Sequence, residues 1–344
     1  SHGAGSPPSP MSDGKKKRIF SGMQPSGEAH LGNYLGALKR WVQMQDEYEC
    51  IWCIVDDHAI TAGGNPADMP GAVFDLAVSF LAVGLDPERA VIFVQSDVHE
   101  HTELAWLFNA VTPKGDLERM TQYKDKAQRF ESVPAGILNY PILQAADILV
   151  YKADAVPVGE DQRQHLELTR EIARKFNHAY GETFPEPEAI IGSAGKILGL
   201  DGDAKMSKSL DNTVGILAAP DDVWAQVRTA VTDPQRVRRT DPGRPEICNV
   251  FSLHMFFTGA DVRADIDERC RSADIGCVDC KRMLSDNIAS AFTPFRERAE
   301  HYRAHPEEVR RILDEGAERA RDIASATMTE VRQRMGLDWR EALT

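Results

Sequence analysis

Ser21-Gly22-Met23-Gln24-Pro25-Ser26-Gly27-Glu28-Ala29-His30-Leu31-Gly32-Asn33 joins a short apolar run, residues 18–20, to a segment with helical apolar spacing. The apolar run predicts a strand, and the spacing predicts a helix. A glycine-rich turn before a helix N-terminus offers free backbone N–H groups, and the helix dipole favours negative charge there. His30 and Asn33 add side-chain donors. The segment therefore predicts an anion site, with an ordinary strand-to-helix turn as the alternative.

Length and composition narrow the class of protein. The 344 residues suffice for one large or two medium domains, and a hydrophobic content of 42% is usual for a globular chain. A net charge of −13 argues against a protein that coats nucleic acid without sequence specificity. The sequence has no run of about 20 apolar residues and no apolar leader, and its six cysteines fit a reducing compartment. We therefore expect a cytoplasmic protein without a membrane span.

The first half of the chain alternates strands with helices, which predicts an α/β fold with a parallel sheet. Strands are expected at residues 18–22, 50–55, 90–95 and 155–158. Helices are expected at residues 31–46, 67–83, 103–110, 116–130, 138–151 and 162–177. Cys50 and Cys53 stand three apart in an expected strand, so they face opposite sides of the sheet and are expected to be core thiols.

From about residue 212 the strand pattern ends. Helices are expected at residues 221–231, 250–257, 264–271, 278–301 and 306–335. Residues 1–14, rich in Ser, Pro and Gly, are expected to be disordered. We therefore divide the chain into a disordered segment at 1–14, an α/β domain at 15–218 and a mostly helical domain at 219–344.

Two polar features interrupt apolar surroundings near the middle of the chain. Asp147 lies within the apolar stretch 145–150. A carboxylate there is costly unless it has a structural hydrogen bond or meets a polar group of a ligand. Gly159-Glu160-Asp161-Gln162 follows the last expected strand of the first half. Because ligands bind at the carboxyl ends of parallel strands, Glu160 and Asp161 are candidates to bind ribose hydroxyls, and capping of the next helix is the alternative.

A second motif, Lys205-Met206-Ser207-Lys208-Ser209, stands far downstream. Together with residues 25–33 it resembles the signature pair of class I aminoacyl-tRNA synthetases. Residues 57–61, 118–122, 145–149 and 156–162 add a finer resemblance, to bacterial-type tryptophanyl-tRNA synthetases. The resemblance runs from about residue 18 to residue 335, and several motifs in the same order are more specific than one.

This resemblance implies a Rossmann-like catalytic domain and a helical anticodon-recognition domain, with the last helices packing back on the catalytic domain. It implies a tryptophan–tRNA ligase. The tryptophan carboxylate attacks the α-phosphate of ATP, pyrophosphate leaves, and the adenylate passes to the terminal ribose of tRNA(Trp). ATP with Mg²⁺, tRNA(Trp) and a second copy of the chain in a homodimer are the implied partners. Such a reaction needs mainly positioning and charge stabilisation.

The resemblance also implies roles for residues that match its motifs. The implied catalytic residues, which stabilise the phosphates and the departing pyrophosphate, are His30, Asn33, Lys205 and Lys208. The implied ATP site comprises Gln24, Pro25, Ser26, Gly32, Asn33, Gly159, Glu160, Asp161, Gln162, Ile197, Lys205, Met206, Ser207, Lys208 and Ser209. The lysine loop is expected to be a mobile lid, and solvated loop charges are the alternative.

The implied tryptophan pocket comprises Phe20, His58, Gln122, Tyr140, Gln144, Asp147, Val156 and Val158. Asp147 is expected to accept the indole N–H, which phenylalanine lacks. A site built for such a bond rejects the analogue by about 10⁴ or more. Position 144 departs from the family, whose bacterial members carry methionine there. We hypothesise that Gln144 alters the range of accepted tryptophan analogues.

Cys248, Cys270, Cys277 and Cys280 form a second cluster, with 21, 6 and 2 residues between them. The spacing is similar to that in a subset of the resembled family, where a four-iron cluster lies near the anticodon-binding region. Four cysteines can hold an iron–sulfur cluster or zinc. Free thiols, or a disulfide under oxidising conditions, are the alternatives that the sequence leaves open.

Two other functions fit parts of the pattern. A tyrosyl enzyme shares the architecture, but residues 145–148 and Phe20 favour tryptophan. The other is an auxiliary paralogue with an altered analogue range, or with a regulatory or partner-binding role in place of housekeeping charging. The presence of His30, Asn33, Lys205 and Lys208 argues against a paralogue that has lost catalysis.

Overall fold

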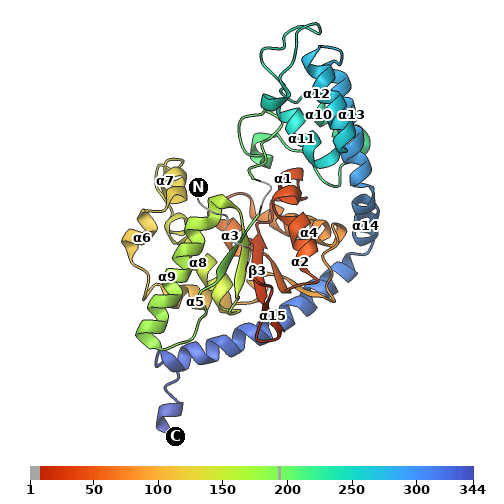
Figure 1. Cartoon of the computed structure of the whole chain (residues 1–344). Helices are drawn as coiled ribbons and strands as arrows, with labels where there is room; N and C mark the ends of the chain where they lie inside the picture. Colours follow the sequence, from red (N-terminus) through yellow and green to blue (C-terminus); the bar gives the residue numbers. More distant parts are fainter. Residues whose placement is uncertain (1–7, 193–194) are drawn as a thin grey trace.

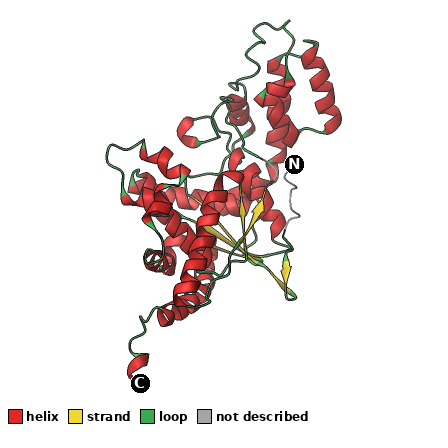
Figure 2. Cartoon of the chain, turned by 60° about the vertical axis from the view of Figure 1, so that its left-hand side comes forward, coloured by secondary structure: helices red, strands yellow, loops and turns green. Residues whose placement is uncertain are grey.

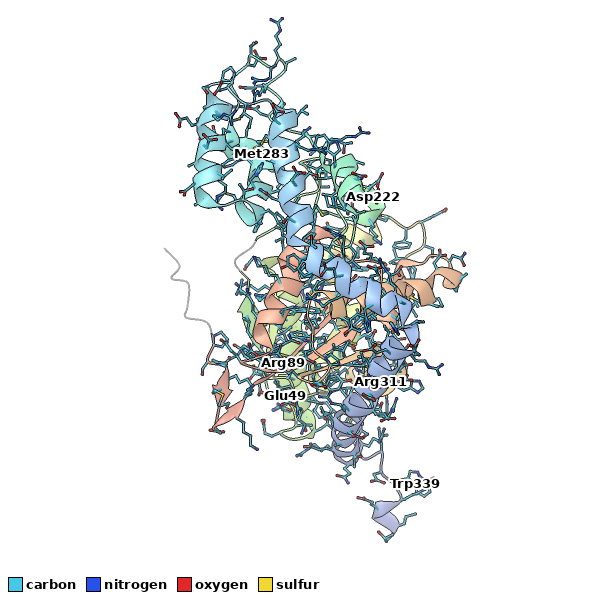
Figure 3. The ribbon with its side chains drawn as sticks, turned by 90° about the vertical axis from the view of Figure 1, so that its right-hand side faces the viewer. Glu49, Arg89, Asp222, Met283, Arg311 and Trp339 are labelled. Carbon is cyan, nitrogen blue, oxygen red and sulfur yellow. The ribbon has the colours of Figure 1, made fainter. Side chains whose placement is uncertain are left out.

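The computed structural model describes residues 8–192 and 195–344 and has two parts, which Figure 1 shows. The larger part is a parallel sheet with helices on both faces, as the strand–helix alternation predicts. The smaller part consists of helices α10 to α13 and stands above the sheet in this view. Figure 3 shows Asp222 and Met283 in this helical part and Arg89 in the α/β part. Within the described residues, no helix has both the length and the apolarity to cross a membrane.

The sheet has five strands among the described residues, in the order β5-β4-β3-β6-β7, and each pairs with its neighbours in parallel. Their bounds are β3 Arg18–Met23, β4 Glu49–Ile54, β5 Ala90–Val94, β6 Ala155–Val158 and β7 Glu188–Ile191. In Figure 2 the strands lie between layers of helices. The chain goes from β3 to β4 on one side, and β6 lies on the other. The carboxyl ends of β3 and β6 therefore form the topological switch point where ligands bind in such sheets.

Alternate residues of the central strands supply two separate cores. Ile19 belongs to the hydrophobic cluster on one face of the sheet, and Phe20 belongs to the cluster on the other. Cys50 and Cys53 are divided in the same way, and both are fully buried. The prediction that these two thiols face opposite sides of the sheet is thus confirmed.

The helices follow the expected pattern with local differences. Their bounds are α1 Leu31–Asn33, α2 Lys39–Met44, α3 Asp56–Ala59, α4 Met69–Ala82, α5 Glu100–Phe108, α6 Lys114–Glu118, α7 Thr121–Ala127, α8 Ala135–Leu149, α9 Arg163–Tyr180, α10 Pro220–Val227, α11 Asn249–Phe257, α12 Ala260–Arg271, α13 Cys277–Ala291, α14 Thr293–Ala304 and α15 Pro306–Arg334. A π-helical stretch, Tyr34–Leu38, separates α1 from α2. Such insertions are frequent near functional sites.

Four expectations about local structure were wrong. The helix expected at 116–130 is two helices, because Met120 has an extended backbone. The helix expected at 278–301 divides at Phe292, where Pro294 restarts it as α14. Strand β7 was not expected at all. Within the segment expected to be disordered, Met11–Ser12 (β1) pairs with Lys15–Lys16 (β2), whereas residues 1–7 of that segment lie outside the described residues.

The last long helix runs back along the α/β part, as Figure 1 shows. At Gly316 of α15 the helix lies so close to β5 that an added Cβ would clash with the carbonyl group of Ile92. Further along the helix, Arg332 forms a two-bonded ion pair with Glu103 of α5. The carboxyl-terminal helix thus packs tightly against an edge of the parallel sheet.

Candidate active site

Backbone hydrogen bonds bring the turn after β3 and the segment after the lysine motif together. The amide of Leu31 donates to the carbonyl of Val214 at 2.7 Å, and the amide of Ile216 donates to Ala29 at 3.1 Å. His30 and Gly215 form an antiparallel bridge between these bonds. Residues 29–31 and 214–216 are therefore paired like two short strands, although they stand far apart in the sequence.

His30 begins the helix that follows the turn. Its backbone N–H donates to Asn33 Oδ1 at 3.0 Å, and its ring Nδ1 accepts the amide of Asn33 at 3.2 Å. Burial, with smaller effects of Lys208 and Lys205, lowers the pKa of His30 to about 4. The ring is therefore neutral at pH 7, and its proton lies on Nε2 because Nδ1 accepts. His30 therefore carries a neutral N–H donor at the N-terminus of the helix that follows the turn.

Glycine at position 32 allows the turn to touch the lysine loop. A Cβ at Gly32 would stand 2.9 Å from His30 Cε1 and 3.2 Å from the Cβ of Met206. Met206 is buried, and its amide donates to the carbonyl of Ile197 at 3.1 Å. The amide of Ser207 donates to Asn212 Oδ1 at 2.8 Å. The middle of the lysine motif is thus anchored.

The two lysines of the motif reach toward different sides of the switch point. A Cβ at Gly27 would lie 2.5 Å from Lys208 Nζ, so this ammonium group lies directly over the turn after β3. Lys205 Nζ lies 3.5 Å from Asp161 Oδ2, which follows β6. Both lysines are thereby placed at the carboxyl ends of the two strands that flank the switch point.

Asp147 lies on α8, with 1% of its surface exposed. Its Oδ2 accepts from His58 Nε2 at 2.7 Å. Its Oδ1 accepts from Gln95 Nε2 at 2.7 Å and from His101 Nδ1 at 2.6 Å. Burial raises the pKa of Asp147, but the charge of His58 and hydrogen bonds from both histidines outweigh it, and the pKa lies below its usual value.

Three of the roughly four lone-pair positions of this carboxylate are therefore occupied, and one remains for a further donor. Neighbouring groups fix the donors in place. The Oε1 of Gln95 accepts the backbone N–H of Asp57 at 3.1 Å, which orients the amide. The hydroxyl of Tyr151 donates to His101 Nε2 at 2.5 Å. The site can hold a buried negative charge in one position.

Apolar side chains pack beside the partners of this carboxylate. Phe20 stacks on Tyr151 with ring centroids 5.6 Å apart. Val156 and Val158 of β6 belong to the same hydrophobic cluster as Phe20. Gln144 is half-buried on α8, three residues before Asp147. Together these residues could bind a large apolar ring that carries one polar group.

A chain of hydrogen bonds connects Gln122 and Tyr140 to the segment after β6. The hydroxyl of Tyr140 donates to Gln122 Oε1 at 2.7 Å and lies 2.9 Å from His165 Nε2. The other ring nitrogen of His165 lies 3.2 Å from Gln162 Oε1. Burial, with a smaller effect of Lys126, lowers the pKa of His165 to about 4, so the ring is neutral at pH 7.

Sequence reasoning missed three members of these networks, namely Gln95, His101 and His165. Gln95 was foreseeable, since it is a polar residue directly after a buried strand, at the edge of the sheet that binds ligands. His165 follows Gln162 by three residues on a helix. His101 carries no such pattern. One expected ribose ligand, Glu160, is bonded through both oxygens to Arg163, at 2.8 and 2.9 Å.

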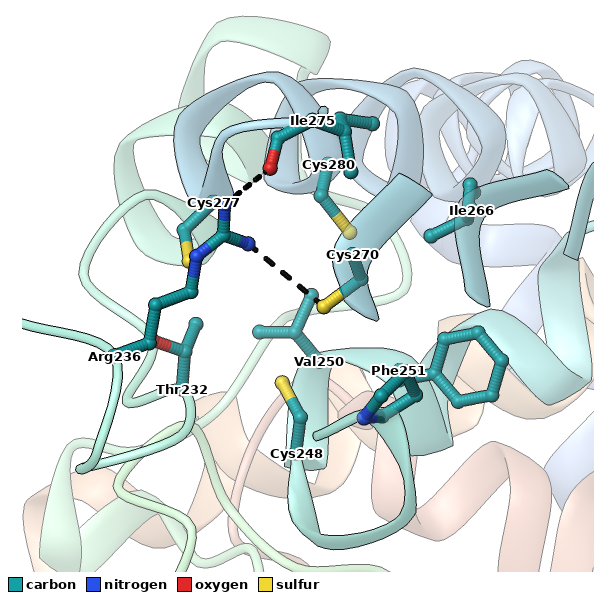
Figure 4. A pocket seen from close by; sticks show the side chains of 11 residues that line it. Thr232, Arg236, Cys248, Val250, Phe251, Ile266, Cys270, Ile275, Cys277 and Cys280 are labelled. Atoms are coloured by element: carbon teal, nitrogen blue, oxygen red, sulfur yellow. Dashed lines mark hydrogen bonds between the residues drawn. The ribbon is translucent and has the colours of Figure 1, made fainter. Parts of the chain in front are cut away.

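The four cysteines of the second cluster line one cavity of about 30 Å³ in the helical part, as Figure 4 shows. Cys248 precedes α11, Cys270 lies in α12, and Cys277 and Cys280 lie in the first turn of α13. All four are free thiols. In the described ranges, no three His, Cys, Asp or Glu side chains are grouped closely enough to hold a single metal ion.

Comparisons with known proteins identify the family of the chain. The family described as tRNA synthetases class I (W and Y) matches residues 12–293. A tryptophan–tRNA ligase of Deinococcus radiodurans is 54% identical over 324 residues, which are 93% of this chain and 98% of that protein. A tryptophan–tRNA ligase of Thermotoga maritima is 45% identical over 326 residues, covering 93% of this chain and 99% of the relative.

A solved structure is also similar. The tryptophanyl-tRNA synthetase of Campylobacter jejuni, in complex with ADP and tryptophan, superposes with a TM-score of 0.84 at 36% identity and covers 93% of this chain and 99% of its own. The chain therefore belongs to the class I tRNA synthetases of the tryptophan and tyrosine type. Within them it is a bacterial-type tryptophan–tRNA ligase. The comparisons do not favour the auxiliary alternative.

Proposed function

We propose that ATP binds at the switch point, between the turn after β3 and the lysine loop. The pairing of residues 29–31 with 214–216 carries this proposal, because it brings the two signature motifs together. His30 Nε2–H donates to a phosphate, and Lys205 and Lys208 stabilise the charge that builds on pyrophosphate. Asp161 and Gln162 meet the ribose at the end of β6.

Tryptophan binds below, with its indole N–H on the fourth position of Asp147 and its ring among Phe20, Val156 and Val158. Its ammonium group meets the hydroxyl of Tyr140 and the amide oxygen of Gln122. This arrangement directs the carboxylate toward the α-phosphate of ATP, so that positioning supplies much of the rate. His165, bonded to Tyr140 and near Gln162, links the two subsites.

Tryptophan-dependent exchange of pyrophosphate into ATP tests this assignment. We expect exchange with tryptophan and none with tyrosine above the rate without amino acid. Lys208→Met should remove most of the exchange rate while leaving the KM for tryptophan within a few-fold. Equal exchange with tyrosine would contradict the pocket, and a full rate in the lysine variant would contradict the phosphate site.

The remaining partners follow from the same assignment. Mg²⁺ accompanies ATP, since it neutralises phosphate charge during such transfers. The helical part, helices α10 to α13, recognises the anticodon of tRNA(Trp), and the reaction takes place in the cytoplasm. The enzyme acts as a homodimer, and we place Trp106 of α5, which is 76% exposed, at the interface between the two copies. Light scattering should give twice the chain mass, and Trp106→Glu should lower it.

The cysteines of the helical part suit an iron–sulfur cluster better than zinc. Zinc–sulfur bonds of about 2.3 Å require all four sulfurs to meet around one atom. Here the sulfurs line a cavity instead, and they come from α12, α13 and the residue before α11. When bound, a cluster of this kind cross-links the helices through thiolate ligands. Iron and sulfide analysis of anaerobically purified protein tests this, and metal-free protein with four titratable thiols would refute it.

A further inference from the structure

A buried histidine connects the cysteine cavity to the neighbouring helices. His254 lies on α11 and has no exposed surface. Its Nε2 lies 3.3 Å from Cys280 Sγ and 3.1 Å from the carbonyl oxygen of the same residue on α13. Its Nδ1 lies 2.6 Å from the hydroxyl oxygen of Thr258, which directly follows α11. The ring therefore spans the distance between a hydroxyl and a cysteine of the cavity.

The neighbours of this ring determine where its proton lies. A carbonyl oxygen only accepts, so the nitrogen beside the carbonyl of Cys280, Nε2, carries the proton. At the other end, Asn287 Nδ2 donates to the hydroxyl of Thr258 at 3.0 Å. That hydroxyl then donates its own proton to the bare Nδ1 of His254. Both ends agree on one direction, from Asn287 through Thr258 and His254 to Cys280.

We propose that His254 is a positioning residue that holds an N–H on the sulfur of Cys280 when the cysteines bind their cluster. The inference rests on the iron–sulfur site proposed above. A thiolate ligand carries negative charge, and an N–H donor fixed beside it stabilises that charge. Arg236 supplies a comparable contact, with Nη1 3.7 Å from Cys270 Sγ, as Figure 4 shows.

Fixed N–H donors have two consequences for an iron–sulfur cluster. Hydrogen bonds to the sulfurs favour the reduced form, which is the more negative one, and so raise the reduction potential. They also hold the ligand in its bound orientation, and loss of such outer contacts typically costs 10- to 100-fold in affinity for the metal, as an order of magnitude. The hydrogen-bonded relay formed by Asn287, Thr258 and His254 therefore affects both the reduction potential of the cluster and the retention of its iron.

Two substitutions at Thr258 separate this role from packing. Thr258→Val keeps the shape of the side chain but removes the hydroxyl that orients the histidine, whereas Thr258→Ser keeps the hydroxyl. The full-length chain and both variants are loaded with iron and sulfide under anaerobic conditions. We measure the reduction potential by a titration followed by absorbance and electron paramagnetic resonance, and the rate of iron release to a chelator.

We expect a more negative potential and iron release about 10-fold faster in Thr258→Val, with values near wild type in Thr258→Ser. If all three loaded proteins share one potential and one release rate, the relay has no positioning role and the inference is refuted. If the wild-type chain acquires no iron and sulfide, the proposed cluster site fails, and the inference fails with it. The two failures are thus distinguishable.

Discussion

Replacing Asp147 by asparagine tests how the pocket selects tryptophan. The carboxylate accepts from Gln95 and His101 on one oxygen and from His58 on the other. Asparagine keeps the shape but replaces one oxygen by an NH₂ group and removes the charge. In either orientation the amide places a donor against at least one of these three donors. The position that we propose for the indole N–H loses its charge in both cases.

The expected loss follows from the strength of one hydrogen bond to a charged acceptor, about 1.5–3 kcal/mol. This converts into a fall of roughly 10- to 100-fold in kcat/KM for tryptophan. Phenylalanine has no N–H to lose, so its kcat/KM lacks this contribution. The ratio of kcat/KM for tryptophan to that for phenylalanine should therefore fall by a similar factor, whereas the KM for ATP should change little.

Pyrophosphate exchange with each amino acid gives this ratio. A partly unfolded variant lowers both rates equally, so misfolding cannot imitate the predicted change. Tyr151→Phe serves as a matched control, because it removes the bond to His101 without touching the carboxylate, and its ratio should change less. An Asp147→Asn enzyme with the wild-type ratio would show that the carboxylate does not bind indole.

Three further predictions concern charge and packing. Lys208→Ala should lower the rate of exchange by roughly 10²–10³-fold with an unchanged melting temperature, since its ammonium group acts on developing charge; a parallel loss of stability would contradict this. The pKa of His165 is lowered to about 4 from an unfolded value near 6.5, so the stability it contributes is present above pH 6.5 and is lost as the pH falls toward 4. Urea unfolding measures how much the free energy of unfolding falls between pH 7 and pH 5. This fall should be about 2 kcal/mol smaller in His165→Gln than in wild type, and equal falls would refute the pKa shift. Gly316→Ala should destabilise the chain by about 3 kcal/mol or more, because its Cβ meets Ile92, whereas Gly71→Ala in open space on α4 should stabilise by about 0.5–1 kcal/mol; similar melting temperatures for the two would count against the packing of α15.

Much of the fold was predictable from local patterns. Strands β3 to β6 have apolar runs bounded by turns, and the alternation of Cys50 and Cys53 between two cores follows from the period of a strand. Strand β7 escaped prediction because its burial is incomplete, with two exposed residues among four. The break at Met120 was not predictable, because its extended backbone does not follow from its residue type.

The site was predictable to the extent that its residues lie in motifs. His30, Lys205 and Lys208 stand in recognisable segments, and the structure places them at one switch point. The donors that satisfy Asp147 were not predictable in the same way, because Gln95 and His101 come from another strand and helix. A carboxylate in an apolar stretch predicts that hydrogen-bond donors lie near it, but only the three-dimensional structure identifies those donors.

Charging of tRNA(Trp) by the purified chain tests the central claim most directly. With ATP, Mg²⁺ and labelled tryptophan, we predict that tryptophan becomes attached to the tRNA, that tyrosine does not, and that Lys208→Met abolishes most of the product. Active pyrophosphate exchange without any charged tRNA would restrict the chain to adenylate formation. Absence of both activities in folded, loaded protein would contradict the assignment of the site.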